Sequence, residues 1–144
     1  MHRVSLLRGA RRARELAEVA AACRAPGATA HERVVDVRDR AAMAEWIEGA
    51  GRLDLVIANA GISAGTGGGT EAGRVARDIF ETNILGVLNT VQPALEVMAE
   101  QEPGPDGWRG HVAVVASLAA FIAGPTAPAY SASKATVQRW TEAR

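Results

Sequence analysis

The sequence predicts an α/β fold built on a parallel sheet, and three observations lead to this prediction. Short apolar segments alternate with segments of helical periodicity along most of the 144 residues. The run at 53–60 is almost continuously apolar, which is typical of a strand covered on both faces. Polar residues and glycines follow the predicted strands, at the sheet edge where open α/β sheets bind ligands. We expect one domain over residues 1–144, because no internal repeat or linker divides the chain.

The first part of the chain predicts two strand–helix units. Arg8 and Gly9 end the first apolar run, and Pro26 and Gly27 stop the helix after it. The expected elements are a strand at 3–7, a helix at 10–24, a strand at 32–37 and a helix at 41–48. The Arg-rich, acid-free stretch at 1–14 also fits a mitochondrial transit peptide. We prefer the strand and helix there, since the following segments continue the same rhythm.

The second part continues the alternation with a longer helix. Its periodic apolar residues, from Val75 to Leu95, predict one uninterrupted helix. A Pro/Gly-rich insertion and a further apolar strand follow it. The expected elements are a strand at 53–60, a loop at 61–70, a helix at 71–98, a hairpin-like insertion at 102–110, a strand at 111–116, a loop at 117–128 and a helix from Tyr130 onward.

Bulk composition excludes several classes of protein. The formal net charge of +0 gives no support for nucleic-acid or membrane-surface binding. No apolar run approaches the ~18 residues of a membrane span. Cys23 is the single cysteine, so no intramolecular disulfide can form, and we expect a cytoplasmic location. The histidines, His2, His31 and His111, are scattered without acidic or cysteine partners at metal spacing, and no metal site is predicted.

Tyr130 and Lys134 form the main candidate for chemistry. They are four residues apart in a segment without Gly or Pro, so a helix would place both side chains on one face. A neighbouring cation and a helix N-terminus both favour the phenolate form of a tyrosine. The alternative is an ordinary amphipathic helix with a surface lysine. Ser131 to Lys134 also matches the Ser-x-x-Lys motif of penicillin-binding hydrolases, but the accompanying motifs of that class are absent.

Several short motifs lie in register with this pair. Together they resemble the short-chain dehydrogenase/reductase family across nearly the whole chain. The matching residues are Asn59-Ala60-Gly61 after the buried strand, Asn83 in the long helix, Ser117 after the next strand, and Tyr130 with Lys134. The resemblance implies a Rossmann-like doubly wound parallel sheet. It also implies an NAD(P)-dependent oxidoreductase that interconverts an alcohol and a ketone or aldehyde by hydride transfer.

The resemblance assigns catalytic roles to four residues. Tyr130 would be the general acid or base at the substrate oxygen, and Lys134 would favour its phenolate and bind the nicotinamide ribose. Ser117 would position the substrate oxygen, and Asn83 would hold a water that links Lys134 to solvent. Two alternatives stay open from the residues alone. Ser117 can cap a loop or helix, and Asn83 can satisfy a buried backbone carbonyl.

Cofactor contacts are also implied by the resemblance. Asp36 and Val37 would contact the adenine, and the turn at Asn59, Ala60 and Gly61 would support the sheet beside the cofactor. Asp36 can equally cap the helix after it.

The sequence favours NADP over NAD, because the first strand ends in arginines rather than an acid. Arg8 is the first of them, followed by Arg11 and Arg12, which would equally suit a solvated helix start. The Gly-rich loop at 61–69 matches no phosphate-binding motif.

The chain departs from the family's pattern at both ends. The family's first strand with its Gly-rich turn, and its C-terminal strands, have no counterpart in the sequence. In the doubly wound order that first strand separates the strands expected at 3–7 and 53–60, so their edges would lie about 10 Å apart. We expect the 144-residue polypeptide to be an incomplete domain and inactive alone. The alternative to an oxidoreductase is a catalytically inactive fragment or interaction subunit that retains a Rossmann-like surface. The complete protein is expected to act on a small alcohol or carbonyl substrate as a homo-oligomer.

Overall fold

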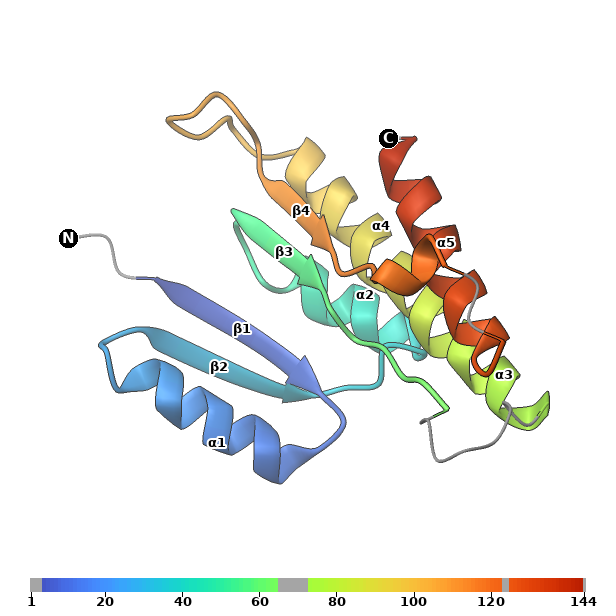
Figure 1. Ribbon diagram of the computed structural model, residues 1–144. Coiled ribbons are helices and arrows are strands. Elements are labelled where there is room, and N and C mark those ends of the chain that lie inside the picture. Colours follow the sequence, from blue (N-terminus) through green and yellow to red (C-terminus); the bar gives the residue numbers. More distant parts are fainter. Residues whose placement is uncertain (1–3, 65–72, 123–124, 144) are drawn as a thin grey trace.

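The computed structural model describes residues 4–64, 73–122 and 125–143, in an alternation of strands and helices (Figure 1). The elements are β1 (Ser5–Ala10), α1 (Ala13–Arg24), β2 (Thr29–Val34), α2 (Arg40–Glu48), β3 (Leu55–Ala58), α3 (Gly73–Phe80), a π-helical turn (Glu81–Leu85), α4 (Gly86–Ala99), β4 (His111–Val114), a 3₁₀ turn (Leu118–Ala120) and α5 (Pro128–Glu142). The predicted α/β class and parallel strands are confirmed.

The strands form two separate sheets rather than one. β1 pairs with β2, and β3 pairs with β4, both in parallel register. Within the described residues no strand joins β1 to β3. The predicted separation of these two edges is therefore confirmed, and the sheet is incomplete relative to the doubly wound order.

β1 continues beyond the end predicted from its sequence. Gly9 does not end the strand but lies inside it, opposite Arg33 of β2. A Cβ atom at Gly9 would lie 2.5 Å from the Trp46 ring of α2. The glycine is therefore required by close packing, a role that glycine also has in strand interiors. β2 likewise ends at Val34 rather than at Val37, although Val35 still donates its backbone N–H to the Ala10 carbonyl oxygen at 3.1 Å.

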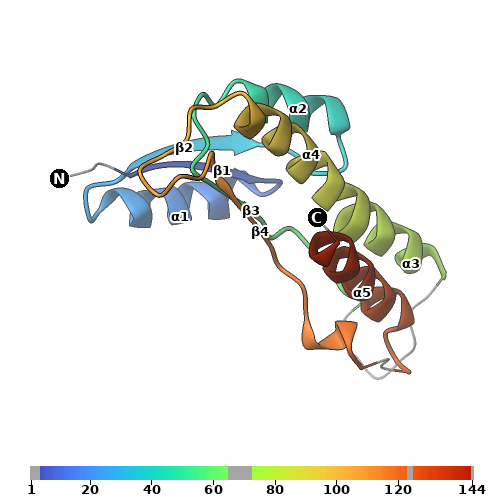
Figure 2. The same ribbon diagram turned by 90° about the horizontal axis from the view of Figure 1, so that it is seen from above.

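Helices cover the two faces of the β1–β2 sheet. Figure 2 shows α1 on one side and α2 on the other. Met43 and Ile47 of α2 pack with Val35 and Ala94 in one buried cluster. α2 begins at Asp39, whose carboxylate accepts a hydrogen bond from the Ala42 backbone N–H at 3.0 Å. The capping role considered for Asp36 is thus wrong, because Asp39 takes that position.

The long helix expected at 71–98 is continuous from Gly73 to Ala99 in the structure, with one π-helical turn inside it. α3 runs through a π-helical turn at Glu81–Leu85 into α4, which ends at Ala99. The predicted start at residue 71 and most of the 61–70 loop lie outside the described residues. Two buried valines of α4 pack against Ala58 of β3 and Val137 of α5. Together these four residues form the second core cluster, which lies beside the carboxyl ends of β3 and β4.

Candidate active site

A cavity of about 200 Å³ lies where β3 and β4 end beside the first turns of α5. Eight residues line it: Asn59, Gly61, Ile62, Ser63, Val115, Ala116, Tyr130 and Lys134. They come from three segments far apart in the chain. This is the sheet edge at which the sequence predicted a site.

The start of α5 places Tyr130 and Lys134 together. Pro128 begins the helix, where its missing N–H is tolerated. Lys134 then follows Tyr130 by one turn, and its ammonium nitrogen lies 6.0 Å from the centre of the Tyr130 ring. Both side chains therefore lie on one face of the helix, as the sequence predicted.

Lys134 is a buried cation. The residue is 4% exposed, and its ammonium donates a hydrogen bond to the Val115 carbonyl oxygen at 2.8 Å. In the part of the chain that the structure describes, no carboxylate lies within 4.0 Å of that nitrogen. A buried charge without an ionic partner is unfavourable for stability.

Asn83 connects the loop after β3 to α5. It is fully buried in the π-helical turn, and its amide binds both backbone groups of Ile62, accepting from N–H at 2.8 Å and donating to the carbonyl at 2.9 Å. Its Nδ2 also donates to Ser133 Oγ at 3.0 Å. These contacts match the alternative considered for Asn83, in which its buried side chain satisfies a backbone carbonyl. The water-holding role stays a prediction.

Ser133 is a site residue that the sequence analysis missed. It is fully buried, accepts the hydrogen bond from Asn83, and donates from Oγ to the Tyr130 carbonyl oxygen at 2.7 Å. It therefore ties the backbone of the tyrosine to the Asn83 cluster. The available signal was its position three residues after Tyr130 and directly before Lys134, on the same helix.

Ser117 follows β4 and begins a 3₁₀ turn. Its Oγ accepts a hydrogen bond from the Ala119 backbone N–H at 3.2 Å, which is the capping role considered as an alternative. It is half-buried and directly follows the lining residues Val115 and Ala116, but it is not itself among the lining residues. The substrate-positioning role stays a prediction.

Asp36 lies just beyond β2 and is held by arginines. Arg38 binds both of its carboxylate oxygens, the closest contact being 2.7 Å, and Arg11 lies 3.9 Å away. The hydrogen bonds from the Arg38 side chain are the main cause that lowers the pKa of Asp36. The carboxylate is thus ionised near neutral pH, and both of its oxygens already accept hydrogen bonds from Arg38.

The other cofactor-side residues lie in different elements: Arg8 is inside β1 rather than at the strand end predicted from the sequence, and Val37 and Ala60 lie in the loops after β2 and β3. Val37 packs against α4, where a Cβ atom at Gly86 would lie 2.6 Å from the valine. Arg8 reaches toward α1, where its guanidinium lies 3.7 Å from Cys23 Sγ. Ala60 is exposed in the turn after β3.

The residues around this cavity could hold one end of a nicotinamide dinucleotide. An ammonium carries three N–H donors, and the bond to Val115 uses one, so two remain for vicinal hydroxyls. A Cβ atom at Gly61 would lie 3.4 Å from both Lys134 Nζ and Asn83 Oδ1, so the glycine keeps this wall open. At about 200 Å³ the cavity is smaller than the ~300–1,000 Å³ of typical ligand pockets, and it would hold the nicotinamide end alone.

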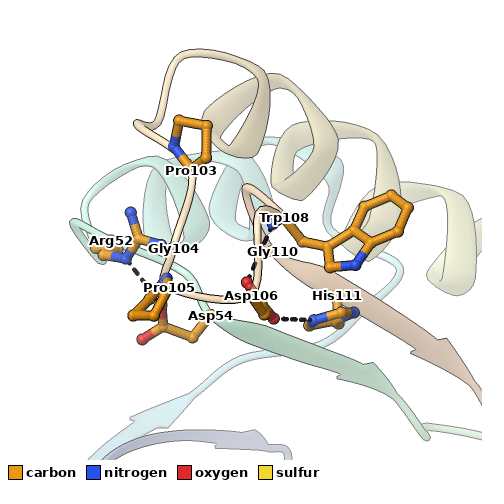
Figure 3. A pocket seen from close by; sticks show the side chains of 9 residues that line it. All are labelled: Arg52, Asp54, Pro103, Gly104, Pro105, Asp106, Trp108, Gly110 and His111. Atoms are coloured by element: carbon orange, nitrogen blue, oxygen red, sulfur yellow. Dashed lines mark hydrogen bonds and ion pairs between the residues drawn. The ribbon is translucent and has the colours of Figure 1, made fainter.

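A second, larger hollow of about 490 Å³ lies at the opposite ends of β3 and β4 (Figure 3). Its charged groups bind one another, as Arg52 donates to Asp54 at 2.8 Å and His111 pairs with Asp106 at 3.0 Å. That hydrogen bond from His111 is the main cause that lowers the pKa of Asp106. The hollow presents no arrangement for acid–base chemistry comparable with Tyr130 and Lys134.

The described residues contain no group of three or more potential metal-ligating side chains. They also contain no helix long and apolar enough to cross a membrane.

Comparisons with known proteins agree on one family. A family profile described as short chain dehydrogenase matches residues 3–144. An uncharacterized oxidoreductase of Myxococcus xanthus is 35% identical over 96% of this chain and 54% of its own length. The dehydrogenase/reductase SDR family member 7B of Bos taurus is 31% identical over 91% of this chain and 41% of its own length.

Solved structures give the same result. A short chain dehydrogenase/reductase of Burkholderia phymatum, solved in complex with NAD, superposes with a TM-score of 0.84 at 25% identity, over 96% of this chain and 49% of that one. The chain thus spans about half the length of the proteins it matches.

Proposed function

Because the chain belongs to the short-chain dehydrogenase/reductase family, we propose that it is an NAD(P)-dependent oxidoreductase that interconverts an alcohol and a ketone or aldehyde. Tyr130 is the general acid or base. The observation that carries this proposal is the buried Lys134 ammonium, which lacks a carboxylate partner among the described residues and lies 6.0 Å from the Tyr130 ring.

The chain's own residues handle the proton. The Tyr130 hydroxyl gives its proton to the substrate carbonyl oxygen in reduction and takes it from the alcohol in oxidation. The Lys134 cation stabilises the phenolate that remains. Ser117 Oγ accepts a bond from the Ala119 N–H, and its own hydrogen donates to the substrate oxygen. Asn83 fixes the cavity wall through Ile62 and holds a water in the proton path.

The proposed cofactor contacts follow from the positions of the loops. Lys134, Tyr130 and the turn at 59–61 hold the nicotinamide end, while Asp36 and Val37 receive the adenine end. When bound, the dinucleotide supplies or accepts the hydride. We favour NADP over NAD because Arg8, with the arginines that follow β1, would meet a 2′-phosphate.

The proposed substrate is a small apolar alcohol or carbonyl compound. Phe121 and Ile122 follow the 3₁₀ turn after Ser117, and each is 70% exposed. Apolar side chains of this size gain most from contact with an apolar substrate.

The test is to supply the full-length protein, rather than the 144-residue chain alone, with NADPH or NADH and a panel of aldehydes and ketones, and to follow consumption of the reduced cofactor. We expect turnover with NADPH, and cofactor binding at least about tenfold weaker in Lys134→Met, with Thr136→Ala on the exposed side of α5 as the matched control. No turnover with either cofactor, or equal affinity in Lys134→Met, would refute the proposal. Turnover by the 144-residue chain alone would also overturn the expectation, from sequence, that it is inactive.

A further inference from the structure

The loop between β2 and α2 is tied to α4, a helix that comes much later in the chain. Figure 2 shows α2 and α4 side by side, and the loop at Val37 leads into α2. Asn89 of α4 donates a hydrogen bond from Nδ2 to the Val37 carbonyl oxygen at 2.8 Å, across 52 positions of sequence. Both residues are half-buried, so the bond is partly shielded from competing water. It fixes the height of this loop against the helix.

Gly86 allows Val37 to approach α4 closely. It lies about one turn before Asn89 and is buried. A Cβ atom at Gly86 would lie 2.6 Å from Val37 Cγ2 and 3.0 Å from Val37 Cβ, which is closer than non-bonded carbon atoms approach. Glycine is unfavourable inside a helix. The close contact with Val37 is a physical reason for a glycine at this position.

The remaining contacts of the loop act mainly within it. The Asp36 carboxylate accepts from the Arg38 backbone N–H at 3.0 Å, and the Asp36 carbonyl oxygen accepts from the Asp39 N–H at 2.9 Å. These bonds close a turn over 36–39, but they do not place that turn relative to α4. The Asn89 bond and the Val37–Gly86 contact do so.

The same helical segment also holds the loop after β3. Asn83 lies less than two turns before Asn89, and its amide binds the backbone N–H and carbonyl of Ile62 at 2.8 and 2.9 Å. The π-helical turn that carries Asn83 runs directly into α4. One continuous segment therefore anchors two loops through two asparagine amides. Ile62 lines the cavity of Tyr130 and Lys134, whereas Val37 lies outside it.

We propose that Asn89 and Gly86 are positioning residues for the adenine end of the cofactor, and that they act through Val37. The inference rests on the proposed function, in which Asp36 and Val37 receive the adenine. Neither residue contacts the reacting atoms. Asn89 holds the Val37 backbone, and Gly86 leaves room for its side chain. Their loss should therefore weaken recognition of the adenine end and leave the nicotinamide end and the proton transfer at Tyr130 unaffected.

The test measures three ligands on the full-length protein by isothermal titration calorimetry. NADPH carries both ends, ADP-ribose carries the adenine alone, and reduced nicotinamide mononucleotide carries the nicotinamide alone. We expect Asn89→Ala to bind NADPH and ADP-ribose about five- to tenfold more weakly, as the loss of one partly buried hydrogen bond implies. Affinity for the mononucleotide should not change. In turnover, KM for NADPH should rise while kcat is retained.

Two further variants separate the hydrogen bond from the shape of the site. Asn89→Asp keeps the shape but removes the donor, so it should weaken ADP-ribose binding at least as much as Asn89→Ala. Gly86→Ala should also weaken it, because the added methyl group displaces Val37.

Thr90→Val is the matched control. Thr90 is the neighbour of Asn89, is half-buried, and also donates one side-chain bond at 2.8 Å, but to the Gly86 carbonyl oxygen within α4. It should leave all three affinities unchanged. Circular dichroism confirms that each variant is folded, and the Asn89 variants decide the question if Gly86→Ala is not.

Three results would overturn the proposal. Unchanged ADP-ribose affinity in both Asn89 variants would show that the bond does not position the loop. An equal loss of ADP-ribose and mononucleotide affinity would show a general structural effect. A wild-type protein that binds none of the three ligands would refute the proposed function as well, whereas the first two results leave that function intact.

Discussion

Replacing Asn83 by alanine removes three hydrogen bonds from a fully buried site. Two of them satisfy the N–H and carbonyl of Ile62, and the third reaches Ser133. Each bond of this kind contributes about 1 kcal/mol net, and more where a buried partner is left unsatisfied. We therefore expect Asn83→Ala to lower the free energy of unfolding by about 3 kcal/mol. This corresponds to a more than hundredfold decrease in the ratio of folded to unfolded protein.

Urea denaturation followed by circular dichroism measures this change. Asn89→Ala is the matched control, because Asn89 is half-buried and donates one bond, to the Val37 carbonyl oxygen at 2.8 Å. That variant should lose about 1 kcal/mol. If Asn83→Ala loses no more than Asn89→Ala, the amide does not hold the cavity wall as described, and the reasoning from these three contacts fails.

Three further predictions concern other parts of the molecule. Gly9→Ala should destabilise the fold by about 1–3 kcal/mol in the same denaturation, because its Cβ would lie 2.5 Å from the Trp46 ring. Lys134→Met should leave the free energy of unfolding unchanged or raise it by about 1 kcal/mol, because it removes a buried charge, while turnover is lost. Asp36 has a folded-state pKa below its ordinary value of 3.8, chiefly because of Arg38, so its ion pair stabilises the fold above that value. The advantage of the wild type over Asp36→Asn should disappear as the pH falls through the lower, folded-state pKa.

Each of these has a result that would contradict it. An unchanged unfolding free energy in Gly9→Ala, with Gly73→Ala as the control in open space, would show that α2 can move away. If Lys134→Met lowers the free energy of unfolding by several kcal/mol, the ammonium stabilises the fold. A pH-independent difference between the wild type and Asp36→Asn would exclude the carboxylate as the titrating group.

The sequence was most informative where a local pattern determines the structure. The spacing of Tyr130 and Lys134 was enough to place them on one face of a helix, because helix geometry is local. The separation of β1 from β3 followed from the family resemblance, because the doubly wound order places the strand without a counterpart between them. The Asn59–Gly61 turn likewise follows a strand whose apolar run was evident.

Features that depend on distant contacts were not predictable. Gly9 was taken as a strand end because nothing near it in sequence shows that the Trp46 ring packs on it. The π-helical turn at Glu81–Leu85 was missed because apolar periodicity continues through it. Ser133 gave no separate signal, since its two partners come from the Tyr130 backbone and from a helix 50 positions away.

The proposed function depends on Tyr130 transferring the proton in a dinucleotide-dependent reduction. The most direct test is the NADPH-dependent reduction rate of Tyr130→Phe at saturating cofactor, relative to the wild type and with cofactor binding measured in parallel. We expect a rate at least ~100-fold lower with cofactor affinity retained, because only the hydroxyl is removed. A rate within twofold of the wild type would contradict it.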